Sequence, residues 1–216
     1  MKEMKTTIFK GIIFGLSVLG LSLSANAEDY VNENSNVSTK KVLVIGLDNV
    51  NSNYFPQSMI TEETGIPTDS ISYTYNKIIT NNIIQSNKDK DYTFVSPVVS
   101  SEINEIIDNI QLKGEEEERY IDLSSIDNNE YHRLIDASNA DYVLFLNQHY
   151  LKWQEKPLRT LFHFVSYSLY DKNQKEITKG NNYFTCMNLE KADKLSKASR
   201  KSSSKIASTV IKSIKK

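Results

Sequence analysis

The chain has 216 residues, with 26 basic and 27 acidic side chains and a net charge of −1 at pH 7. This balance excludes the general electrostatic attraction to nucleic acid that a strongly basic protein has, so we expect no nucleic-acid partner. A single cysteine, Cys186, excludes an intramolecular disulfide and leaves the core to be held by packing. We interpret Cys186 as a small buried side chain late in a strand; the alternative is a nucleophile or a cross-link to a partner.

Residues 1–27 have the pattern of a signal peptide. Lysines precede a short apolar run over 11–23, and the sequence A-N-A follows at 25–27. This order is typical of proteins exported to the periplasm or beyond, and the run is shorter than the roughly 20 apolar residues that span a bilayer. We expect cleavage after residue 27, no lipid-attached cysteine, and no transmembrane helix in the 189 residues that remain. Residues 28–39 are polar and predict a flexible lead-in to a single domain over 40–216.

The apolar run over 42–47 predicts a central strand that is covered on both faces. Asp48 and Asn49 follow it, and residues 49–67 form an unusually long connection before the next predicted element. Ligands in open α/β sheets bind outside the carboxyl ends of the strands. Asp48 and Asn49, with the connection over 49–67, are therefore a candidate small-ligand site. The alternative is that Asp48 only satisfies backbone groups of the loop.

The middle of the chain alternates helices with one strand. The predicted elements are a helix over 68–86, a strand over 92–96, a helix over 101–113 and a short helix over 127–139. The charged run at 115–119 is interpreted as a solvated loop, because adjacent carboxylates without fixed geometry rarely converge on a metal ion.

After residue 140 the pattern changes to long alternating strands. Strands are predicted over 142–153 and 161–170, and a four-residue turn at 171–174 leads to a strand near 176–178 that continues toward 187. The full order is strand–helix–strand–helix–helix–strand–strand–strand–helix. It predicts an α/β (α+β) fold with a mixed sheet, a C-terminal antiparallel meander and helices packed on the sheet.

The last segment, residues 189–216, is predicted to be a basic helix. It carries nine Lys or Arg and two acidic residues, a net charge of +7, whereas the rest of the mature chain carries −10. Lys201, Lys205 and Lys212 are our candidate contacts with anionic lipid, a cell-envelope polymer or an acidic protein. The alternative is a helix packed on the sheet with its lysines in water. The apolar stripe is thin and rich in Ala and Ser, which favours close packing over insertion into lipid.

No motif of catalytic chemistry is found in the sequence. The three histidines, His132, His149 and His163, have no metal-binding spacing, and the chain has neither a nucleophile elbow nor a glycine-rich phosphate loop. We therefore expect no enzymatic activity, no cofactor and no metal site. His149 shares a predicted strand face with Trp153, so the two are a candidate aromatic binding patch; alternatively, they cover the edge of the core. His163 alternates with apolar residues and is interpreted as a hydrogen-bonded histidine of the core or the sheet.

A family resemblance becomes visible in the last third of the chain. An A-D-Y-V step leads into a strand, and a second strand of the form Y-x-L-x-D turns through polar residues into a strand with a glycine. Across residues 41–185 this arrangement resembles the amino-terminal domain of TolB and the related domains of curli-secretion-type periplasmic lipoproteins. The resemblance implies a module without catalytic residues that acts through protein contacts in envelope assembly or transport. The matching residues are Ala140, Asp141, Tyr142, Val143, Tyr167, Leu169, Asp171 and Gly180.

Two main hypotheses follow. In the first, the chain is an exported, non-catalytic envelope protein that works through protein–protein contacts, with peripheral membrane contact through the basic helix as an option. In the second, it is a periplasmic or extracellular module that binds a small molecule or glycan. That module would use Asp48 and Asn49, or the strand from His149 to Trp153. An enzyme of an unrecognised type is a third option.

Overall fold

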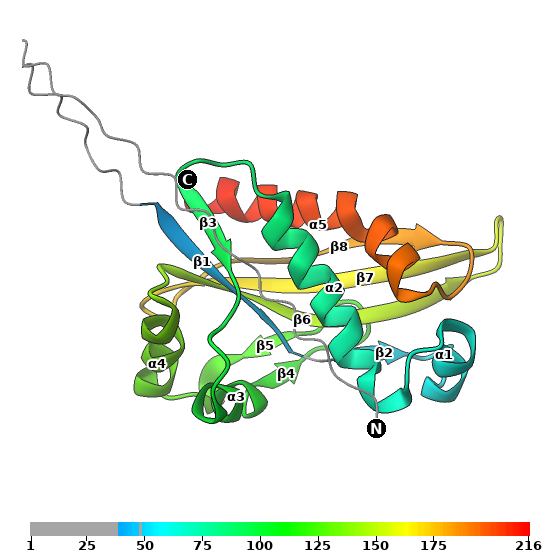
Figure 1. The fold of residues 1–216 in the computed structure, drawn as a ribbon, viewed down its shortest axis with the longest axis horizontal. Coiled ribbons are helices and arrows are strands. Elements are labelled where there is room, and N and C mark those ends of the chain that lie inside the picture. Colours follow the sequence, from blue (N-terminus) through cyan, green and yellow to red (C-terminus); the bar gives the residue numbers. More distant parts are fainter. Residues whose placement is uncertain (1–38, 48) are drawn as a thin grey trace, which may run out of the picture. The chain divides into compact units, whose positions relative to one another are not determined.

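The computed structural model describes residues 39–47 and 49–216. The predicted signal peptide, nearly all of the lead-in and Asp48 lie outside these described residues. Figure 1 shows the helices and strands of the described chain. They are β1 (Lys40–Gly46), β2 (Val50–Ser52), α1 (Gln57–Thr64), α2 (Ile71–Ser86), β3 (Tyr92–Val95), α3 (Ser101–Asp108), β4 (Gln111–Lys113), β5 (Tyr120–Asp122), α4 (Asn128–Ser138), β6 (Tyr142–Gln154), β7 (Thr160–Asp171), β8 (Glu176–Cys186) and α5 (Ala192–Ile214).

A mixed sheet organises the chain, with strands in the order β3-β1-β6-β7-β8 and with β2 added to β6. β1 is parallel to β3 and β6, whereas β6, β7 and β8 form the predicted antiparallel meander. β2 continues along β6 where β1 stops, because Gly46 lies opposite Leu146 and Val50 lies opposite His149. The predicted α/β class and mixed sheet are therefore confirmed.

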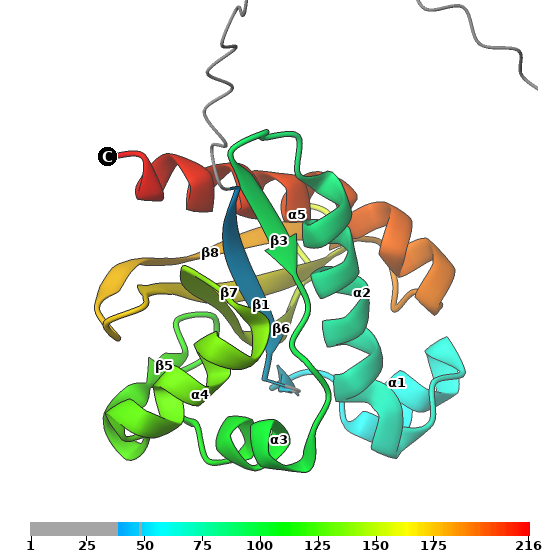
Figure 2. The ribbon, with the colours of Figure 1, turned by 60° about the vertical axis from the view of Figure 1, so that its left-hand side comes forward.

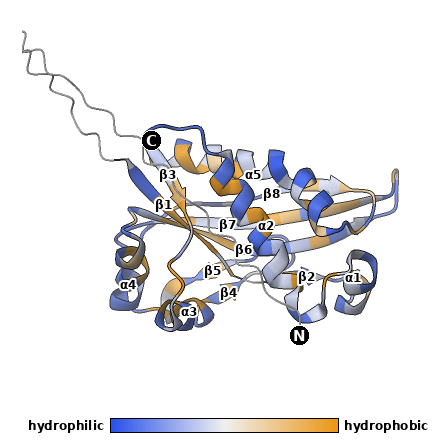
Figure 3. Ribbon diagram, in the orientation of Figure 1, coloured by the Kyte–Doolittle hydropathy of each residue, from blue (hydrophilic) through white to orange (hydrophobic). Residues whose placement is uncertain are grey.

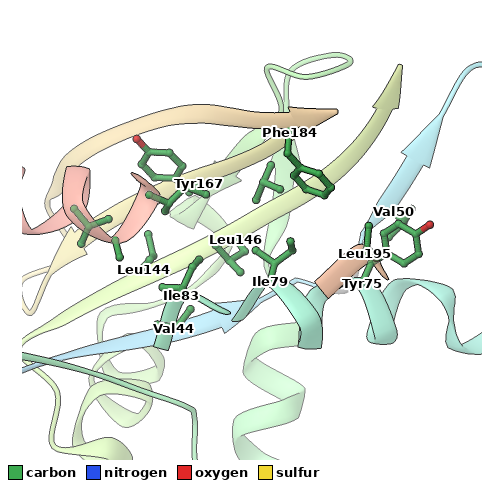
Figure 4. Close-up of a cluster of buried hydrophobic side chains, with 14 of the residues drawn as sticks. Val44, Val50, Tyr75, Ile79, Ile83, Leu144, Leu146, Tyr167, Phe184 and Leu195 are labelled. Carbon is green, nitrogen blue, oxygen red and sulfur yellow. The ribbon is translucent and has the colours of Figure 1, made fainter. Parts of the chain in front are cut away.

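Helices cover both faces of the sheet, as Figure 2 shows. On one face, α2 and α5 contribute Tyr75 and Leu195 to the same buried apolar cluster as Leu144 of β6 (Figure 4). On the other face, α3 and α4 belong to a second cluster that includes Tyr131. Figure 3 shows hydrophobic and hydrophilic residues interspersed along α2 and α5, as expected of helices buried on one side. Residues 42–45 of β1 are at most 1% exposed, because this strand is covered on both faces.

Several short elements are not predicted by the sequence. The connection over 49–67 contains β2 and α1, so its interpretation as one long loop is wrong. α1 follows Pro56 and ends at Gly65, whose φ of 74° lets its N–H reach the carbonyl of Thr61. The predicted helix over 101–113 ends at residue 108, because the residues of β4 pair with β5 in a separate two-stranded sheet. The charged run at 115–119 is the turn between these two strands.

A β-bulge at Asn147 changes which side chains of β6 face α2 and α5. The pairing of β6 with β7 shifts register between Leu146 and Gln148. Leu146 before the bulge and Leu151 after it both pack into the cluster under α2 and α5, although an unbroken strand would turn them to opposite faces. The side-chain amide of Asn147 is buried and donates to the hydroxyl of Ser168 at 3.1 Å. The bulge therefore turns the odd-numbered residues that follow it toward this core.

Two aspartates of the sequence resemblance hold strand ends. The carboxylate of Asp141 accepts the N–H of Lys41 at 2.8 Å and so joins the starts of β1 and β6. The carboxylate of Asp171 accepts the N–H groups of Asn173 and Lys175 at 2.8 and 3.0 Å in the predicted turn between β7 and β8. Both hydrogen-bonding roles stabilise the ends of strands.

Candidate functional site

α5 packs one side against the sheet and α2 and leaves the other side in solvent. Leu195 and Ile206 are among its buried residues. Asn82 of α2 donates to the carbonyl of Ser196 at 2.8 Å and to the hydroxyl of Ser199 at 2.9 Å. Small serine side chains on the buried side let the two helices approach closely. The solvent-facing side of α5 is therefore held in a fixed orientation.

A row of exposed lysines runs along this solvent-facing side. Lys197, Lys201, Lys205 and Lys212, called here the lysine row, are all exposed. At 3.6 residues per turn their positions fall within a sector of about 80°, and at 1.5 Å per residue the row is about 22 Å long. The candidate contacts predicted from the sequence thus lie on one line that a partner surface can touch at once. Their role as partner contacts stays a prediction.

The lysine row lacks counter-ions in the part of the chain that the structure describes. Beyond the two ends of the row, on the same side of the helix, Lys194 pairs with Glu190 at 3.7 Å, and Lys215 pairs with Asp89 at 2.8 Å and with Asp91 at 3.4 Å. The row itself places like charges four residues apart, which destabilises a helix by about 0.2–0.5 kcal/mol per pair. Packing of the apolar side of α5 against the sheet does not by itself require lysines four residues apart on the exposed side.

His149 and His163 meet inside the core under α2. The Nε2 atom of His149 lies 2.9 Å from Nδ1 of His163, and both residues are at most 1% exposed. The ring of Tyr75 meets His149 edge to face at 4.9 Å, and Phe184 stacks on His163 at 4.5 Å. Burial lowers the pKa of His149 to about 3. Burial, with His149 as its neighbour, also holds the pKa of His163 well below its ordinary value, so both rings are neutral at pH 7.

The predicted patch of His149 and Trp153 is not one open surface. Both residues belong to the same side of β6, but Tyr75 of α2 packs on the buried His149, whereas Trp153 is partly buried near the end of the strand. The Trp153 ring meets Phe55 edge to face at 5.8 Å and carries the Arg159 guanidinium over its face at 4.9 Å. His149 is thus a core residue in this conformation, and ligand binding by Trp153 stays a prediction.

Asn49 lies at the break between β1 and β2. Its carbonyl accepts the N–H of His149 at 2.8 Å, and its side-chain carbonyl accepts the amide N–H of Asn51. Asn49 also lines a cavity between α2 and α3. Asp48, the other candidate at this position, lies outside the described residues. The cavity's other side chains, Asn76 and Thr80 among them, are missed by the sequence reasoning. The two residues are four positions apart on a predicted helix, and this spacing is the sequence signal that places their polar side chains on one side of it.

Cys186 is half-buried beside the core. Burial, and to a smaller extent the nearby carboxylate of Glu190, raises the pKa of its thiol to about 11. The thiol is therefore protonated at neutral pH, which favours the interpretation as a packed side chain over that of a nucleophile. In the described chain, no three His, Cys, Asp or Glu side chains cluster in a way that suits a metal ion. Within residues 39–47 and 49–216, no helix combines the length and apolar character needed to cross a membrane.

Comparisons with known proteins give distant similarities in structure. No family model and no curated protein matches the sequence. The hypothetical protein CT253 from Chlamydia trachomatis is similar with a TM-score of 0.41 and 10% identity, over 68% of this chain and 73% of that chain. The PelC dodecamer from Paraburkholderia phytofirmans is similar with a TM-score of 0.37 and 12% identity, over 81% of this chain and 89% of that chain. These values are too low to transfer a function.

Proposed function

We propose that this chain is an exported, non-catalytic protein of the bacterial envelope, and that it acts by docking on an acidic partner protein through the lysine row of α5. Export rests on the basic start, the short apolar run and the A-N-A sequence at 25–27. Docking rests on one observation: four exposed lysines share one side of a helix without counter-ions among the described residues.

The charge pattern fits a partner that approaches through electrostatic attraction. Lys197, Lys201 and Lys205 follow one another at about 6 Å along the helix, which is less than the Debye length of about 8 Å at physiological salt, so their fields add; Lys212 lies about 10 Å beyond Lys205. Such a field speeds encounter with an acidic surface more than it raises final affinity. The apolar side of α5 is already buried against the sheet, so the helix offers charge rather than an apolar face. This combination favours a protein surface over insertion into lipid.

A binding role agrees with the buried position of the two histidines that contact each other. Among the described residues, His149 and His163 are the only two histidines in contact with each other, and both are enclosed in the core. A substrate in solution does not reach them in this conformation, and a general base must be within hydrogen-bond reach of its substrate. We therefore propose binding without catalysis.

The test uses charge reversal with a matched control. The variant Lys201→Glu with Lys205→Glu reverses the middle of the lysine row. The control, Lys172→Glu with Lys175→Glu, makes the same change in net charge at exposed positions of the β7–β8 turn. The tagged mature proteins are cross-linked mildly in envelope extract at low and high salt, and the products are identified by mass spectrometry. We expect an acidic protein that is recovered by the wild type and the control, is lost with the reversed row, and is weakened by salt.

Two results would contradict the proposal. Equal recovery of every partner by the reversed-row variant would show that the row is not the contact. Binding of the purified protein to phosphatidylglycerol vesicles, abolished by the same reversal and with no protein partner found, would assign the row to the membrane surface instead. Circular dichroism and thermal melts of both variants establish that the fold is intact.

A further inference from the structure

A cavity of about 790 Å³ lies between α2 and α3, outside the carboxyl ends of β1 and β3. The connection from β1 to the neighbouring β3 runs through α2 on one face of the sheet, and β3 is followed by α3 on the other face. Helices that diverge in this way leave a crevice at the strand ends. The volume falls within the range of roughly 300–1,000 Å³ that is typical of small-molecule sites. The cavity shares no residue with the lysine row, so its role is independent of the docking function.

The floor of the cavity includes backbone that no neighbouring strand covers. β3 ends at Val95, opposite Leu43, whereas β1 stays paired with β6 as far as Gly46. The N–H of Leu47 donates to the carbonyl of Leu146 on the β6 side. Because successive residues of a strand direct their backbone groups to opposite sides, the N–H and C=O of Gly46 point beyond the end of β3. The floor therefore offers a backbone donor and a backbone acceptor.

α2 presents a polar side to the cavity while its apolar side faces the core. The cavity-lining residues of this helix recur at spacings of three and four. They are Tyr73, Asn76, Lys77, Thr80 and Asn81. Tyr73 is 55% exposed, so its ring is available to solvent, and the Nζ atom of Lys77 lies 5.2 Å from the ring centroid. An aromatic face and a set of hydrogen-bonding groups thus lie on the same wall.

The opposite wall is formed by α3 and by the segment after β3. Asn104, Ile107 and Asp108 line it from the helix, and Ser96 lines it from the strand end. Among the described lining residues, Asp108 is the only acidic group and Lys77 the only basic group, so this part of the lining has no surplus of positive charge. Its other polar groups are amides and hydroxyls, which both donate and accept hydrogen bonds.

We propose that this cavity binds an uncharged, hydroxyl-rich ligand, namely one or two units of a neutral glycan. Asn81 and Asn104 contact its hydroxyl groups from opposite walls, and the backbone of Gly46 does so from the floor. The Tyr73 ring and Ile107 contact the apolar faces of the sugar rings. A phosphate or carboxylate on the ligand finds no surplus of positive charge here, so charged sugars gain nothing over neutral ones.

The test is an NMR titration of the ¹⁵N-labelled mature protein with maltose, cellobiose and N,N′-diacetylchitobiose at millimolar concentrations. We expect at least one of the three to shift the backbone amides of Gly46, Ser96 and Asn104. The double variant Asn81→Ala with Asn104→Ala is expected to weaken this binding about tenfold or more, since it removes two hydrogen-bonding side chains. Both side chains are exposed, so the variant keeps the fold; Asn188→Ala, an exposed position outside the cavity, is the matched control.

Three outcomes would overturn the proposal. They are the absence of shifts with all three disaccharides, shifts that the double variant leaves unchanged, and tighter binding of digalacturonate or glucose 6-phosphate than of any neutral sugar. The reversed-row variant of α5 is titrated in parallel and is expected to bind the sugar like the wild type. A failure of the docking function and a failure of the cavity site are therefore separable.

Discussion

Lowering the pH from 7 to 5 is expected to destabilise this protein through the buried pair of His149 and His163. Burial lowers the folded-state pKa of His149 to about 3 and that of His163 well below its ordinary value, whereas an unfolded histidine has a pKa of about 6.5. Below pH 6.5 the unfolded chain therefore binds protons that the folded chain does not. The free energy of unfolding is at its full value above this pH and falls as the pH is lowered toward the folded-state pKa values.

The size of this effect follows from the depth of burial. Each pH unit below 6.5 removes about 1.4 kcal/mol per histidine that stays neutral in the fold. At pH 5 this amounts to about 2 kcal/mol for His149, and protonation of His163 in the unfolded chain adds to this loss. Because domains of this size are stable by about 5–15 kcal/mol, the loss is a large part of the total.

Urea denaturation at pH 7, 6, 5.5 and 5 measures this loss directly. The variant His149→Gln with His163→Gln keeps two polar side chains that can hydrogen-bond but removes the two titrating groups, so its stability should depend much less on pH than that of the wild type. His132→Gln removes a histidine outside the pair and is the matched control. Parallel pH profiles for the wild type and the double glutamine variant would refute the reasoning.

Three further predictions concern stability and are measured by urea denaturation at pH 7. Gly46→Ala places a Cβ 3.1 Å from the Cβ of Asn76 and should cost about 1–3 kcal/mol; an unchanged midpoint would show that α2 moves to make room for it. Asp127→Ala removes the capping box of α4 and should cost about 1 kcal/mol, whereas Asp127→Ser should retain most of the stability. Asp141→Ala leaves the Lys41 N–H without its carboxylate acceptor and should cost about 1–3 kcal/mol; no change in midpoint would show that water replaces it.

Much of the fold is predictable because its main elements carry strong periodic signals. The central strand, α2, the meander and the basic helix all follow from apolar patterns of six residues or more. The ends of α4 follow from local chemistry, since Asp127 forms a capping box with Glu130 and Asn139 takes the left-handed conformation that ends the helix. In contrast, β2, β4 and β5 have three residues each, too few to show an alternation; β4 and β5 pair with each other, whereas β2 pairs with the distant β6.

The candidate sites differ in the same way: some follow from local sequence patterns, and others depend on contacts between distant segments. Exposure of Lys201, Lys205 and Lys212 follows from helical spacing alone. The contact between His149 and His163 depends instead on strand register and on the bulge at Asn147, neither of which leaves a local signal in the sequence. The cavity depends on where β3 stops relative to β1, which is a property of the assembled sheet.

The order of strands in the sheet also determines when the fold can be completed during synthesis. β1 is the first strand of the described chain, yet it lies between β3 and β6, and Val42 pairs with Tyr142, a full 100 residues later in the chain. When β1 leaves the ribosome, neither of its neighbours exists, and although β3 is made about 50 residues later, the edge of β1 that pairs with β6 has no partner until residue 142 has been made. Closure of such a long loop precedes the contacts that stabilise it, which slows folding and lengthens exposure of the strand. The domain therefore reaches its native state late and as a whole, and a nascent chain that stops before β6 has no central sheet.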